Sequence, residues 1–333
     1  MSEAADGATV NFAVRSRGGE RVSLTVLKPP APGAGGEGKW GSMEVSLDPV
    51  FNRTGDTWHV ALSGLKGLGG LVYGWRVDGD VSWESGSRLQ PDQLLLDPQA
   101  SRLAYLPSHP APPVPMPTLR GGATVAASSL AGLAPGGGLP AGQVERPRWG
   151  LEEVRMLEVD VRTFAAGKGV AHPGTFLGVA ERLDHIRAVG ANAVLLGPCY
   201  ATSEGIGSLS RAAVSHFAPD PELSSDPADP SAAPRELHAM VAALHAAGVE
   251  VLLTLDLTFT AEGTDAAPHT LGLRGLDHAA YYRANGVMNA GHAVVRQYTL
   301  DAARRWASDY GVDGFAFANA ENLVQGARRG GGV

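Results

Sequence analysis

The chain has 333 residues, of which 44% are hydrophobic and 18% are charged, and its formal net charge is −7 at pH 7. This length accommodates two domains, and the composition is that of a soluble globular protein. Nucleic acids and anionic membrane surfaces are bound through clustered Lys and Arg side chains. The acidic balance and the lack of a basic cluster therefore exclude both as partners.

Cys199 is the only cysteine, so an intramolecular disulfide is impossible, and we expect an inert core thiol. Residues 1–6 are acidic and lack the basic and apolar regions of a signal peptide. No run of about 18 apolar residues occurs. We therefore expect a soluble chain with no visible transit or signal peptide.

Residues 1–104 show short alternating segments, which predict an antiparallel β-sandwich of immunoglobulin-like type. The segments with period two are 9–14, 22–27, 58–62 and 73–77. Residues 52–56 and 67–70 supply turn chemistry. Four aromatic side chains are candidates for stacking on sugar rings, with burial in the sandwich core as the favoured alternative: Trp58, Tyr73, Trp75 and Trp83.

Residues 105–148 lose all periodicity and are rich in Pro, Gly and Ala. This composition predicts a linker or large loop between two domains.

Residues 149–333 alternate between strand and helix patterns. The expected strands are 154–161, 193–197, 249–257 and 312–319. The expected helices are 176–186, a helix from Pro234 to Gly248, and one that buries Val295, Tyr298, Ala302 and Trp306. Such β-α-β units predict a parallel sheet with any site at the carboxyl ends of its strands. The sheet is either open or the first half of a (β/α)8 barrel, truncated after strand four.

The fourth strand has an unusual distribution of side-chain sizes. Gly314, Ala316 and Ala318 share one face, whereas Phe315 and Phe317 lie on the other. We expect the Phe face to pack against helices. The small residues leave the opposite face almost bare, at the strand end where a site would lie.

Several segments in one order resemble the isoamylase-type starch and glycogen debranching enzymes of the α-amylase superfamily, glycoside hydrolase family 13. In the first domain the resemblance rests on Leu47-Asp48-Pro49, on 52–60, on Tyr73-Gly74 and on 95–98. In the second it rests on 217–221, 240–253, 260–263, 274–277, 294–297 and 312–315.

The resemblance implies a glycogen-binding-like sandwich, an eight-stranded barrel and α-1,6 debranching of a glucan by two carboxyl groups about 5 Å apart. The family pattern for strand four is V-D-G-F-R-F-D, whose last Asp is the nucleophile and whose Arg holds it. Ala318 and Ala316 occupy these positions. In strand three the family's Asp, Asn and His become Thr254, Thr258 and Phe259. A sugar-stacking Y-W-G-Y becomes 208–211.

Three side chains are candidates for a residual carboxylate: Asp256, Asp160 and Glu321. The favoured alternative is that Asp256 is a hydrogen-bonded pocket residue and that the other two are loop or capping groups, because catalysis needs a positioned pair. The histidines show no metal-ligand spacing, so no metal or other cofactor is expected. Asp313 lies at the opposite end of strand four, where a role in stability is expected.

Three hypotheses follow. The first is a non-catalytic protein similar to the silent isoamylase subunits of plants and green algae. That resemblance implies binding to α-glucan, association with an active isoamylase, and a plastid location. The second is an active debranching hydrolase that uses displaced carboxylates such as Asp256. The third is a truncated barrel without function, which exposes strand four as an edge.

Overall fold

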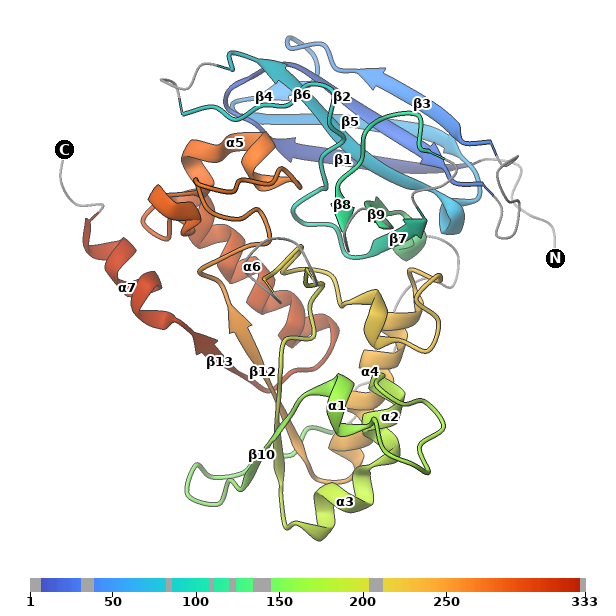
Figure 1. Ribbon diagram of the computed structural model, residues 1–333, viewed down its shortest axis with the longest axis vertical. Coiled ribbons are helices and arrows are strands. Elements are labelled where there is room, and N and C mark those ends of the chain that lie inside the picture. Colours follow the sequence, from blue (N-terminus) through green and yellow to red (C-terminus); the bar gives the residue numbers. More distant parts are fainter. Residues whose placement is uncertain are drawn as a thin grey trace.

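The computed structural model describes residues 7–30, 39–81, 86–107, 111–119, 124–133, 145–203 and 212–329. Antiparallel β-sheets from the N-terminal part lie above a second unit in which a parallel sheet is combined with helices (Figure 1). Among the described helices, none is both long and apolar enough to cross a membrane.

The N-terminal unit consists of two antiparallel sheets. One has the order β1-β5-β4, and the other has the order β3-β2-β6-β9-β7, with β8 paired to β9. The strands are β1 (Ala8–Arg15), β2 (Gly19–Lys28), β3 (Gly41–Ser46), β4 (Arg53–Thr54), β5 (Thr57–Leu65), β6 (Val72–Gly79), β7 (Leu103–Pro107), β8 (Thr118–Leu119) and β9 (Thr124–Ser129). All four segments predicted from alternation are strands, and Trp58 and Trp75 are fully buried between the sheets.

Part of the stretch predicted as a linker forms sheet instead. β9 lies within residues 105–148 and pairs with β6 through Tyr73 and Ser128, and with β7 through Ala104 and Ala127. Ala126 and Ala127 are fully buried. Small side chains give a weak alternation signal in the sequence. This strand is therefore specified by its backbone pairing with β6 and β7 and by the burial of its alanines, which leaves no space for larger side chains. Residues 108–110, 120–123 and 134–144 of the predicted linker lie outside the described residues.

The second unit is built on a parallel sheet in the order β10-β11-β12-β13. Its strands are β10 (Met156–Val159), β11 (Ala193–Leu196), β12 (Glu250–Asp256) and β13 (Gly314–Ala318). Its helices are α1 (Val161–Phe164), α2 (Phe176–Glu181), α3 (Leu183–Ala188), α4 (Ala232–Ala246), α5 (Leu273–Tyr281), α6 (Ala293–Asp309) and α7 (Ala320–Arg329). It also has the 3-10 turns η5 (Pro221–Leu223) and η6 (Ala284–Gly286), and the N-terminal unit has the 3-10 turn η4 (Ala131–Leu133) after β9.

The helical faces follow the 3.6-residue period. α6 buries the four predicted residues, Val295, Tyr298, Ala302 and Trp306. α4 ends before Gly248, whose φ of 78° suits a residue without a side chain. The helix predicted over 176–186 is two helices, α2 and α3, because the backbone of Arg182 leaves helical geometry between them.

The two faces of the parallel sheet differ. Val251, Leu253 and Leu255 of β12 are buried in one cluster with the apolar face of α4, so the alternate residues Thr254 and Asp256 face the other way. The expectation that both Phe side chains of β13 pack against helices is wrong for Phe317, which is 46% exposed. β13 is an edge strand of this sheet, so Phe317 has a neighbouring strand on one side only.

Asp313 connects the amino ends of β12 and β13. Its Oδ2 accepts a hydrogen bond from the backbone N–H of Val251 at 2.8 Å and lies 2.7 Å from Nε2 of the buried His245. This agrees with the expected place of Asp313, at the end of the strand opposite to the site.

Asp313→Ala is expected to lower the free energy of unfolding by about 2 kcal/mol, because it leaves a buried imidazole and a strand N–H without their acceptor. Urea unfolding measures the loss. Asp92→Ala is the matched control, since Asp92 is 97% exposed and its 3.8 Å ion pair with Arg76 contributes little. Equal losses in the two variants would contradict the structural role of Asp313.

α5 fastens the two units together. Arg15 of β1 forms an ion pair with Asp277, and the Ser16 hydroxyl donates a hydrogen bond to the carbonyl of Leu276 at 2.7 Å. Leu276 itself is fully buried in the sandwich core. A Cβ at Gly275 would lie 2.6 Å from a Cδ atom of the buried Leu95, so a larger residue would require that side chain to shift. The segment 274–277 therefore belongs to the interface between the sandwich and the α/β unit.

Candidate functional site

The carboxyl ends of the parallel strands meet at one edge of the sheet, and Asp256 lies at its centre. The Asp256 Oδ1 accepts a hydrogen bond from the backbone N–H of Thr258 at 2.9 Å, and its Oδ2 accepts one from Nδ2 of Asn319 at 2.9 Å. Asn319 has a left-handed φ of 52°, which Asn tolerates better than most residues. Both carboxylate oxygens are thus tied to the turns that follow β12 and β13.

The backbone of Asp256 is held from the other side by two buried rings. Its N–H donates to the hydroxyl of Tyr200 at 3.2 Å, and its carbonyl accepts from Nε2 of His216 at 2.8 Å. Nδ1 of His216 lies 3.1 Å from the Tyr298 hydroxyl. Burial lowers the pKa of His216 to about 4, so the ring is neutral and carries its proton on Nε2 at pH 7. The position of Asp256 is therefore fixed on both sides.

The residues beside Asp256 on the same face carry no charge. In the register of the parallel pair, Ala316 lies opposite Thr254 and Ala318 lies opposite Asp256. Thr258 is buried, and its hydroxyl donates to the carbonyl of Asn319 at 3.3 Å. The structure thus places methyl groups next to a single carboxylate at the end of β12 and β13. Phe259 follows directly and is half-buried.

The other two candidate carboxylates both lie at the starts of helices. Asp160 is the N-cap of α1 and accepts from the N–H of Thr163 at 3.1 Å. Glu321 is exposed in the first turn of α7.

A buried carboxyl group near this edge was missed from the sequence. Asp220 is 1% exposed, forms an ion pair with Arg162 at 2.9 Å and caps η5. Burial raises the pKa of Asp220, and the Arg162 guanidinium acts against that rise. The only sign of this group in the sequence was an acidic residue after Phe217-Ala218-Pro219. Its burial and its ion pair with Arg162 depend on the tertiary structure.

In the part of the chain that the structure describes, no three His, Cys, Asp or Glu side chains come together in a way that could hold a metal ion. Cys199 is buried, and burial raises the pKa of its thiol. The ends of β12 and β13 therefore offer hydrogen-bonding groups, small apolar groups and the Asp256 carboxylate to a ligand, whereas the Asp220 carboxyl group is buried and paired with Arg162.

Comparison with known proteins identifies the family. No family model matches the chain. It is 30% identical to chloroplastic isoamylase 3 of Oryza sativa subsp. japonica over 95% of this chain and 43% of that protein. It is 33% identical to chloroplastic isoamylase 2 of the same plant over 98% of this chain and 39% of that protein. The glycogen debranching enzyme of Salmonella paratyphi B is 29% identical over 94% and 48%. The chain belongs to the isoamylase and glycogen debranching enzyme family. It spans less than half the length of these relatives.

Solved structures share the fold of this isoamylase-family chain. A pullulanase from Paenibacillus barengoltzii complexed with maltotetraose superposes with a TM-score of 0.73 at 18% identity, over 99% of this chain and 51% of the pullulanase. A group B Streptococcus pullulanase gives 0.72 at 19% identity, over 98% and 44%. The predicted fold class is confirmed: an antiparallel β-sandwich precedes four parallel strands with helices.

The aromatic residues proposed for glucan stacking are core residues of the isoamylase-family sandwich. Trp58 and Trp75 are 0% exposed, and the Trp58 indole donates to the carbonyl of Ser16 at 3.2 Å. Tyr73 is 8% exposed and its hydroxyl donates to Asp97 at 2.9 Å. Fully buried rings cannot stack on a sugar, so Trp58 and Trp75 are excluded as stacking residues, whereas Tyr73 is largely buried and lines a cleft beside the sandwich. Trp83 lies outside the described residues, as does the segment 208–211.

The buried carboxylate of Glu262 accepts four hydrogen bonds, and the sequence did not reveal this role. It is 2% exposed; Oε1 accepts from the N–H groups of Leu271 and Gly272, and Oε2 accepts from the N–H of Arg274 and the hydroxyl of Tyr282. It therefore folds the loop after β12 back toward α5 and the sandwich. Its sequence was noted only as part of the family match at 260–263.

Proposed function

We propose that this chain is a non-catalytic, α-glucan-binding member of the isoamylase family, which acts together with an active isoamylase. The observation that carries this proposal is the face made by Ala316 and Ala318 beside Asp256, whose two oxygens each accept a hydrogen bond from the protein.

The chemistry of debranching supports the proposal. Retaining cleavage of a glycosidic bond needs two carboxyl groups about 5 Å apart, one as nucleophile and one as acid. The methyl group of Ala318 cannot attack an anomeric carbon. The methyl group of Ala316 cannot orient or stabilise a carboxylate. Asp256 has the contacts of a residue that holds the ends of two strands in place.

Binding to glucan is supported by the relatives. The matched plant proteins are isoamylases, the bacterial one is a glycogen debranching enzyme, and one pullulanase of the same fold was solved with maltotetraose. With Ala316 and Ala318 in place, β13 still pairs with β12 in the four-stranded parallel sheet. The plant relatives are named chloroplastic, which favours a plastid location for this protein.

The test is a debranching assay on amylopectin combined with a glucan pull-down, both with and without an active isoamylase. We expect the protein to sediment with amylopectin, to release no linear chains alone, and to change the rate of the active isoamylase. Release of linear chains by the wild-type protein that Asp256→Asn abolishes would instead establish the alternative, an active hydrolase that uses Asp256.

Phe259→Ala is expected to weaken the binding of malto-oligosaccharide roughly fivefold, because this half-buried ring lies three residues after Asp256 and loss of one aromatic contact costs about 1 kcal/mol. Isothermal titration calorimetry with maltohexaose measures the change. Phe51→Ala is the control, since Phe51 is 80% exposed on a turn of the sandwich. An unchanged affinity in Phe259→Ala would place the glucan elsewhere.

A further inference from the structure

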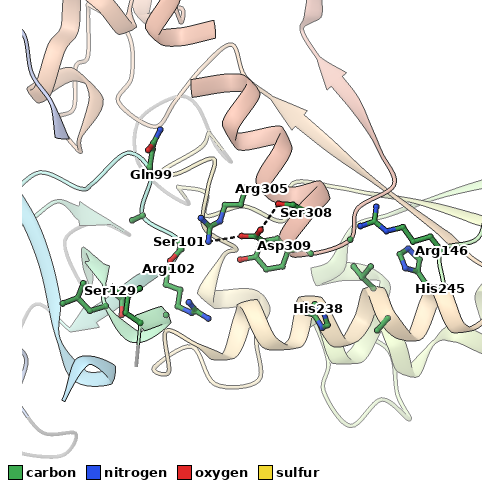
Figure 2. A pocket seen from close by; sticks show the side chains of 18 of the residues that line it. Gln99, Ser101, Arg102, Ser129, Arg146, His238, His245, Arg305, Ser308 and Asp309 are labelled. Atoms are coloured by element: carbon green, nitrogen blue, oxygen red, sulfur yellow. Dashed lines mark hydrogen bonds and ion pairs between the residues drawn. The ribbon is translucent and has the colours of Figure 1, made fainter. Parts of the chain in front are cut away.

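A cleft with a volume of about 680 Å³ lies between the sandwich and the α4 and α6 helices. The sandwich contributes the loop at 99–102, Ser129 and η4, and the α/β unit contributes the later turns of α4 and the end of α6 (Figure 2). Helices run antiparallel to the strands they connect, so the helix ends at His245 and Gly311 lie at the amino ends of the strands. This cleft is therefore distinct from the edge that holds Asp256.

The cleft is rich in positive charge although the whole chain carries a net charge of −7. Its lining includes three guanidinium groups, those of Arg102, Arg146 and Arg305, and one carboxylate, Asp309. Asp309 forms an ion pair with Arg305 at 3.5 Å and accepts a hydrogen bond from the Ser308 hydroxyl at 2.8 Å. Among the described lining residues, guanidinium groups therefore exceed carboxylates by two.

Two of the guanidinium groups come from different units of the protein and influence each other. Arg102 is 6% exposed; its pKa is lowered, chiefly by burial and also by the neighbouring charge of Arg305, while Tyr310 acts in the opposite direction. Arg305 in turn lowers the pKa of Tyr310, which burial raises. Figure 2 shows Arg102 on the sandwich side and Arg305, Ser308 and Asp309 along α6. Like charges brought together in a polar cleft are stabilised by an anion between them.

Gly132 keeps Arg102 in this position. A Cβ at Gly132 would lie 1.9 Å from Nη1 of Arg102, so the guanidinium group occupies the space that any other residue would fill. The third cation, Arg146, donates from Nη2 to the carbonyl of Ala307 at 2.9 Å, which holds it at the end of α6.

We propose that this cleft is a binding site for the phosphate monoester of a small polar molecule. Guanidinium groups bind phosphate oxygens through paired hydrogen bonds, and a phosphate monoester carries about −1.5 to −2 charges at pH 7, which matches the surplus of two. Ser101, Ser129 and Gln99 supply hydrogen-bonding groups for a polar body such as a sugar. The volume lies within the range of small-molecule sites, about 300–1,000 Å³.

The test is titration calorimetry at low ionic strength with inorganic phosphate, glucose 1-phosphate, acetate and maltose. We expect glucose 1-phosphate to bind more tightly than inorganic phosphate, and acetate and maltose not to bind in this cleft. Absence of phosphate binding overturns the proposal. Equal binding of acetate overturns the assignment to a phosphate ester, and maltose binding that depends on this cleft overturns the assignment to an anion.

Two variants localise the binding. Gly132→Ala keeps every charge but displaces the Arg102 guanidinium, and Arg305→Gln removes one cation; each is expected to weaken binding of glucose 1-phosphate at least tenfold. Arg304→Gln is the control, because Arg304 is on the same helix and its side chain is 68% exposed. If Arg304→Gln weakens binding as much as Arg305→Gln, the anion binds to the general surface charge and the proposal is wrong.

Should thermal unfolding show that Gly132→Ala is not folded, the comparison of Arg305→Gln with Arg304→Gln decides whether the anion binds in this cleft. Glucan binding at Asp256 is independent of all three variants, so failure here leaves the proposed function untouched.

Discussion

Glu262→Gln is expected to lower the free energy of unfolding by about 3–5 kcal/mol. The carboxylate accepts hydrogen bonds from three backbone N–H groups and the Tyr282 hydroxyl in a site that is closed to solvent. An amide places its own N–H₂ donor against one pair of these donors and leaves them unpaired. Because the partners lie at 271–274, the contact between α5 and the sandwich should loosen as well.

Urea unfolding and limited proteolysis of the segment 263–271 measure these two effects. Glu20→Gln makes the same chemical change at an exposed position of β2 and should alter stability by less than about 0.5 kcal/mol. A similar, small loss in both variants would show that Glu262 does not organise this loop.

Acidification from pH 6.5 to pH 4 is expected to cost the protein about 3 kcal/mol of stability through His216 alone. The pKa of His216 is lowered from 6.5 to about 4, first by burial, so in this window the unfolded chain binds a proton that the folded protein does not. The free energy of unfolding therefore falls by about 1.4 kcal/mol per pH unit as the pH is lowered. The contribution of His216 to the free energy of unfolding is fully present above pH 6.5.

His216→Gln removes the titration while it keeps one donor and one acceptor in the side chain. Its stability should depend on pH less steeply than that of the wild-type protein, and denaturant unfolding at pH 7, 5.5 and 4 gives the difference. Burial also lowers the pKa of His278 to about 4, and His278→Gln serves as the comparison at a half-buried position. Parallel stability profiles for the wild-type protein and His216→Gln would refute the assignment.

Elements with strong side-chain periodicity could be predicted from the sequence. The buried face of α6, the alternation of β12 and the four parallel strands all follow from local spacing, since that spacing decides which side chains share a face. β9 escaped prediction, because its small residues carry no such signal and its place depends on β6 and β7. Phe317 was misjudged because exposure of an edge strand depends on what lies beside it.

By itself the sequence determined the order of the elements and the two alanines of β13, because these are properties of local residues and their spacing. Only the tertiary structure decided the rest. It buried Trp58 and Trp75, tied both oxygens of Asp256, and brought Arg102 and Arg305 to one cleft. The burial of the two rings, the contact of Asn319 with Asp256 and the proximity of the two arginines all join residues far apart in the chain. Their proximity is set by packing of whole elements and leaves no periodic trace in the sequence.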